Sequence, residues 1–172
     1  MEENINLESE GILRELQFDF SSFTIESFIQ CIGEAKGRQI ITIPWDMPPT
    51  LFGAWISDEE EPNEYIFYRR NVPVIHQIHI QLHELSHFLF GHPTLQINRK
   101  LIAEVVAGTA FLPFTELPQL RSPKRADVET AAETLANLIQ ERAIRNSRLD
   151  ELTHALSSDE RLVNFVKTMG LA

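Results

Sequence analysis

The chain has 172 residues, of which 43% are hydrophobic and 23% are charged, a composition typical of one soluble globular domain with its own core. Fifteen Lys and Arg against 25 Asp and Glu leave a formal charge of −10, which argues against general nucleic-acid binding because phosphate neutralisation needs a basic surface. The single cysteine, Cys31, excludes an internal disulfide framework and a cysteine-based zinc site. We expect no signal peptide or transmembrane helix and a cytoplasmic location, because the first ten residues carry four acids and no base and no apolar run could span a bilayer.

The N-terminal third is predicted to contain two amphipathic helices, over residues 7–17 and 23–36, where apolar residues recur at helical spacing. Gly37 ends the second helix. From residue 38 the period changes, and strands are predicted over residues 38–44, 51–56 and 64–69. Because short connections join these strands, we expect a small antiparallel three-stranded sheet.

The strongest helical pattern follows Pro73, where apolar residues recur every three or four positions up to Leu89 and the helix ends at Gly91. Another helix is predicted over residues 101–111, then a proline-rich connector over 114–123. Further helices are expected over 126–144, 149–156 and 159–169. The sequence therefore predicts an α+β fold, with residues 1–113 as a core with N-terminal helices and 114–172 as a helical extension packed on it.

The predicted helix after Pro73 contains His83-Glu84-Leu85-Ser86-His87, which matches the pattern HExxH. Positions i and i+4 share one helical face, so both imidazoles can bind one metal ion. Glu84 lies beside them and can reach a water molecule on that ion. We expect His83 and His87 to hold one Zn²⁺ per chain and Glu84 to be the general base.

A catalytic zinc site needs a third protein ligand. The metzincin pattern would place glycine at position 90 and histidine at position 93, and Phe90 and Pro93 exclude it. Glu104 is the one carboxylate in the apolar run 101–112, and a buried charge needs a partner such as a metal. His92, five residues after His87, stays open as a rival ligand at the end of the helix.

The motif segment HELSHFLFGH at residues 83–92, followed by AEVVA at 103–107 and FLP at 111–113, resembles the ImmA/IrrE metallopeptidases over about residues 40–113. The resemblance implies a zincin-like fold, in which the HExxH helix packs on a small sheet and a glutamate of the following helix completes the zinc site. Carried over residue by residue, it makes His83, His87 and Glu104 the ligands and Glu84 the catalytic base.

Members of that family typically cleave or otherwise inactivate a helix-turn-helix repressor in phage, mobile-element or stress-response circuits. The resemblance therefore implies a zinc-dependent endopeptidase that acts on such a repressor. From the −10 charge and the lack of a long apolar run, we expect no direct contact to nucleic acid or membrane. Two rival hypotheses remain open. One is a metal-binding regulator that sequesters the repressor without hydrolysis, and the other is an adaptor whose C-terminal helices carry the function.

Several other side chains are candidates for supporting roles. His79 and His92 can orient a ligand through a hydrogen bond or contact substrate. Tyr65, Tyr68 or His79 can stabilise an oxyanion, and an extended substrate is expected to lie along the sheet edge near Trp55 or residues 65–68. The acidic loop 58–61 is expected to be exposed, either attracting a basic partner or serving only as a solvated turn.

Overall fold

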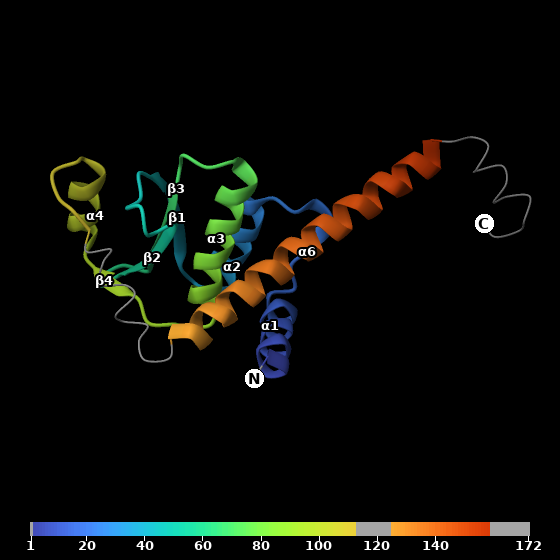
Figure 1. Cartoon of the computed structure of the whole chain (residues 1–172), viewed down its shortest axis with the longest axis horizontal. Coiled ribbons are helices and arrows are strands. Elements are labelled where there is room, and N and C mark those ends of the chain that lie inside the picture. The colour runs from blue at the N-terminus through green and yellow to red at the C-terminus, as the bar shows by residue number, and fades with distance from the viewer. Residues whose placement is uncertain (1, 113–124, 159–172) are drawn as a thin grey trace, which may run out of the picture.

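The computed structural model describes residues 2–112 and 125–158 and shows an α+β fold. Within these residues there are five α-helices, a short 3-10 helix and one four-stranded sheet (Figure 1). None of the helices in the described ranges is both long and apolar enough to cross a membrane. The predicted connector over 114–123 and the predicted helix over 159–169 lie outside the described residues.

Of the N-terminal helices, α2 begins and ends where the sequence provides capping groups. Helix α1 spans Glu2–Leu16 and α2 spans Ile25–Lys36, with the 3-10 helix η1, Phe20–Ser22, between them. The Thr24 side chain accepts a hydrogen bond from the Ser27 backbone, and the Ser27 side chain accepts one from Thr24, which forms a capping box. Gly37 takes the left-handed conformation (φ 63°) that ends α2.

The sheet contains strands β1 (Gln39–Trp45), β2 (Gly53–Asp58), β3 (Asn63–Arg69) and β4 (Leu95–Ile97), in the order β1-β3-β2-β4. Only the hairpin of β2 and β3 is antiparallel, whereas β1 is parallel to β3 and β4 is parallel to β2. The predicted antiparallel three-stranded sheet is therefore wrong. Strand β3 inserts between its two predecessors, and β4, with only three residues, completes the edge beside β2.

Side chains alternate across the sheet, so each face packs against different helices. On one face, Trp55 and Ile66 join a core with residues of α1, α2, α3 (Val74–Leu89) and α6 (Arg125–Ser158). On the other face, Ile56 and Phe67 pack with β4 and with α4 (Arg99–Val106). The HExxH motif lies on α3, so the first face positions the candidate site.

Helix α6 lies against α3 and continues beyond the other elements (Figure 1). The two helices predicted over 126–144 and 149–156 are one continuous helix, because no proline or glycine interrupts the chain between them. Leu135, Ala136 and Ile139 of α6 are fully buried in the same core as α3. The described part of the predicted C-terminal extension therefore shares the core of the N-terminal part.

Candidate metal centre

Three side chains meet where α3 packs against α6. The Nε2 atoms of His83 and His87 lie 3.1 Å apart, and Oε2 of Glu129 lies 3.2 Å from the first and 3.4 Å from the second. Together they offer two imidazole nitrogens and one carboxylate oxygen within 4.8 Å of one another. This group can hold a metal ion.

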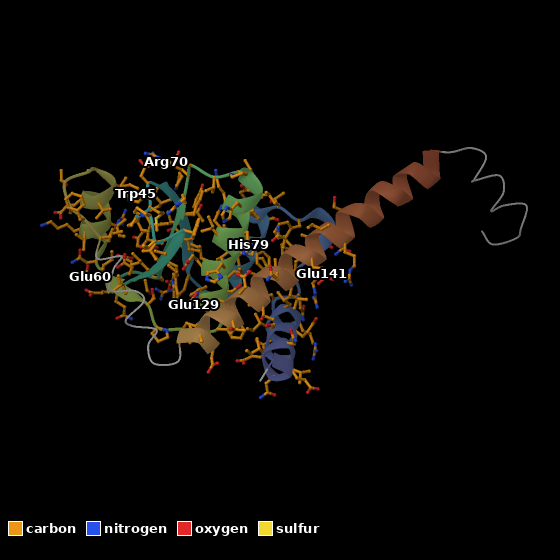
Figure 2. The ribbon with its side chains drawn as sticks, viewed as in Figure 1. Trp45, Glu60, Arg70, His79, Glu129 and Glu141 are labelled. Carbon is orange, nitrogen blue, oxygen red and sulfur yellow. The ribbon has the colours of Figure 1, made fainter. Side chains whose placement is uncertain are left out.

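The spacing of residues on each helix explains why these side chains converge. On α3, His79, His83 and His87 recur every four residues and so lie along one helical face. On α6, Glu129 lies one turn before Glu133, beside the buried apolar residues of that helix. Figure 2 shows His79 and Glu129 on the two facing helices, which are held together by the core beneath.

The second ring nitrogen of each histidine also has a partner. Nδ1 of His83 lies 3.2 Å from Oε2 of Glu133, and Nδ1 of His87 lies 2.8 Å from Nδ1 of His92. Gly91, with φ 66°, lets the chain reverse after α3, so that the His92 amide donates to the carbonyl of His87 at 3.0 Å. This reversal places His92, the rival candidate ligand, next to Nδ1 of His87, so it does not belong to the group formed by His83, His87 and Glu129.

The surroundings favour a positive charge on His83 in the metal-free protein. Burial alone would lower the pKa of its imidazole, but the hydrogen bond to Glu129 and the charges of Glu84, Glu129 and Glu133 outweigh burial and raise the pKa above its ordinary value. This concentration of acidic groups around two histidines is also an environment that stabilises a bound cation.

Glu84, the predicted general base, is buried next to the centre and does not belong to the three-ligand group. Its Oε2 accepts a hydrogen bond of 3.0 Å from the backbone amide of Trp55 in β2. Gly53, two residues earlier, allows this approach, because a Cβ there would lie 3.0 Å from Cγ and Oε1 of Glu84. The structure thus ties the carboxylate to strand β2.

Glu104, predicted as the third ligand, does not lie beside His83 and His87. It belongs to α4, on the opposite face of the sheet from α3, and its side chain is 43% exposed, with Oε1 3.8 Å from Nζ of Lys100. Only Ile102 and Val105 of α4 are buried. The apolar run 101–112 therefore does not enclose the carboxylate, and the carboxylate that lies beside the two histidines is that of Glu129.

The remaining candidates divide between the two faces of the sheet. His79 lies beside the centre, with Nε2 3.4 Å from Oε2 of Glu133. Tyr65 lies on the opposite face, where its hydroxyl donates to Oδ2 of Asp58 at 3.0 Å, so it is remote from α3. Tyr68 shares the face of Ile66 by alternation, and no contact of its side chain with the three ligands is observed in the described residues.

The acidic loop 58–61 begins with a structural residue. Asp58 is buried and accepts hydrogen bonds from the backbone amides of Glu60 and Glu61 and from the Tyr65 hydroxyl. Burial alone would raise the pKa of this carboxyl, but the hydrogen bonds together lower it. Only the three glutamates that follow, Glu59, Glu60 and Glu61, are exposed charges.

Glu129 has no motif that marks it as a ligand. It lies 129 − 87 = 42 residues after the second histidine, beyond the proline-rich segment. The available signal is the i, i+4 pair Glu129 and Glu133 at the border of the apolar stripe of α6, which mirrors the histidine spacing of α3. Such pairs are common on solvated helices, so the pattern gains meaning only with the packing of the two helices.

Comparison of the chain with protein-family models, with curated proteins and with solved structures gives no match.

Proposed function

We propose that this protein is a zinc-dependent endopeptidase with His83, His87 and Glu129 as ligands and Glu84 as general base. The observation that carries the proposal is the convergence of an HExxH pair with a carboxylate from a second helix. Ligand atoms about 2.0–2.2 Å from a tetrahedral zinc lie about 3.3–3.6 Å from one another. The observed separations of 3.1, 3.2 and 3.4 Å are close to that range.

Each group has a definite task in peptide hydrolysis. Bound zinc would lower the pKa of a coordinated water to about 7 and polarise the scissile carbonyl. Glu84 accepts the proton of the attacking water and then delivers it to the leaving amine, as general acid–base catalysis requires. Glu84 is buried and directly follows His83 in the chain, and its hydrogen bond to the Trp55 amide holds the carboxylate against strand β2. The substrate edge predicted near Trp55 or residues 65–68 is not an edge of the described sheet, because β2 lies between β3 and β4 and β3 lies between β1 and β2.

The proposed substrate is a regulatory protein, with a helix-turn-helix repressor as the first choice. Two observations support it: the resemblance of residues 83–92 to the ImmA/IrrE metallopeptidases, and the −10 charge, which favours contact with a basic protein. The family glutamate is then supplied by Glu129 rather than Glu104. A cytoplasmic site of action belongs to the same proposal.

The test combines metal analysis with a digest of a proteome-derived peptide library, read by mass spectrometry. Untagged wild-type protein should contain about one zinc per chain, and the double variant His83→Ala, His87→Ala should contain none. Glu84→Gln should keep zinc and fold, since the amide oxygen still accepts from Trp55, but lose cleavage. The matched control Glu104→Gln should cleave like wild type.

Two results would contradict the proposal. Zinc content unaffected by loss of both histidines would remove the metal centre. Cleavage or repressor relief by Glu84→Gln equal to that of wild type would remove proteolysis and favour a regulator that binds without hydrolysis.

A further inference from the structure

The Glu133 carboxylate of α6 lies within hydrogen-bond distance of the His83 ring nitrogen that faces away from the candidate centre. Oε2 of Glu133 lies 3.2 Å from Nδ1 of His83, and Nε2 of the same ring faces the His87 and Glu129 atoms of the centre. When Nε2 of a histidine binds a metal, Nδ1 carries the ring proton and needs an acceptor. Glu133 is placed to be that acceptor.

Glu133 is itself held on several sides. Oε1 accepts from the Asn137 amide at 3.1 Å, one turn further along α6, and Oε2 also faces Nε2 of His79 at 3.4 Å. Nδ1 of His79 is in turn 3.0 Å from Oε1 of Gln140. The carboxylate is thus fixed by both helices although its side chain is 49% exposed.

The two candidate histidine ligands differ in what supports them. His83 is backed by a carboxylate, whereas His87 is backed by the imidazole ring of His92. Hydrogen bonds to an ionised acceptor are roughly twice as strong as those between neutral groups, and they increase the electron density of the ring. The carboxylate therefore affects the metal affinity of His83 through charge as well as orientation.

We propose that Glu133 is a positioning residue for the metal centre, which fixes the Nδ1 proton of His83 and so presents Nε2 to the ion, with His79 and Asn137 holding the carboxylate in place. The inference rests on the proposed zinc site. It assigns to α6 two tasks one turn apart: Glu129 supplies a ligand and Glu133 orients another.

Two substitutions separate the charge of Glu133 from its hydrogen bond. Glu133→Gln keeps an oxygen acceptor and removes the charge, while Glu133→Ala removes both. Glu141→Gln is the matched control, because Glu141 lies two turns further along α6 (Figure 2) and is exposed in an ion pair with Arg145.

The first measurement is zinc affinity of the full chain by chelator competition. Glu133→Ala should weaken zinc binding about 10–100-fold, the usual cost of losing such a partner, and Glu133→Gln should fall between it and wild type. Glu141→Gln should bind as wild type does. The second measurement is the visible spectrum of the Co²⁺-loaded proteins, which should change in both Glu133 variants and not in the control.

A residue that only stabilises the fold gives a different result. Unfolding of the metal-free variants would then be easier, while zinc affinity and the Co²⁺ spectrum of the folded protein would match wild type, and the inference would be overturned. If wild-type protein binds no zinc, both the proposed function and the positioning role of Glu133 fail. If wild type binds zinc and both Glu133 variants bind equally well, only the positioning role fails.

Discussion

Exchange of Glu129 for alanine is the sharpest test of which carboxylate completes the centre. The oxygen of Glu129 lies within 3.4 Å of both candidate nitrogens, so the substitution removes one of the three proposed ligands. Loss of a residue that only supports a ligand costs about 10–100-fold in metal affinity. We therefore expect Glu129→Ala to weaken zinc binding by more than about 100-fold.

The effect can be read as a change in thermal stability. At free zinc about 100-fold above the wild-type dissociation constant, binding stabilises the native state by about 2.7 kcal/mol. For a chain of this size that raises Tm by roughly 5–11 °C, at about 2–4 °C per kcal/mol. At the same zinc concentration a variant weakened about 100-fold gains only about 0.4 kcal/mol, so its Tm should rise by less than about 2 °C.

Differential scanning calorimetry with and without zinc provides the assay, and Glu104→Ala provides the control. Glu104 is partly exposed beside Lys100, on the opposite face of the sheet from the two histidines, so its variant should keep the full zinc-dependent rise in Tm. If Glu104→Ala loses that rise while Glu129→Ala keeps it, the arrangement of α3 and α6 described above is not the metal centre.

Two further predictions concern the residues around the centre. Gly53→Ala should lower the free energy of unfolding by about 1–3 kcal/mol and reduce the proposed peptidase activity, because the new Cβ would lie 2.6 Å from Cγ2 of Ile80 and 3.0 Å from Cγ and Oε1 of Glu84. In urea unfolding the control Gly11→Ala, where an added Cβ has no neighbour within 4 Å, should instead stabilise helix α1 by about 0.5–1 kcal/mol. The carboxyl of Asp58 has a pKa below its ordinary value in the folded protein. Its ionised form therefore adds to the free energy of unfolding above the unfolded-state pKa of about 3.9, and this stabilisation is lost as the pH falls through the folded-state pKa. Acid unfolding of Asp58→Asn followed by circular dichroism should therefore show a shallower loss of stability below about pH 4, and a slope equal to that of wild type would contradict the role of its hydrogen bonds.

Local patterns predicted α3 and its two histidines because helical periodicity and the i, i+4 spacing are properties of a continuous segment. They failed where the answer depends on packing between distant segments. The order of the strands was wrong because short connections suggest sequential pairing, yet β3 lies between β1 and β2. Glu104 was misplaced because an apolar run was equated with burial, although Val106 in that run is 53% exposed. Glu129 was missed because a carboxylate on a helix gains a role only when another helix brings histidines to it.

The contribution of α6 to the centre has a practical consequence for anyone who shortens this chain. A protein cut after Pro113 would retain the whole HExxH signature and look like an intact peptidase unit by sequence. It would nevertheless lack the Glu129 oxygen and the side chains of Leu135 and Ile139 that cover α3. Such a fragment should expose the apolar side of its motif helix and aggregate, and its failure to bind zinc would say nothing about the 172-residue chain.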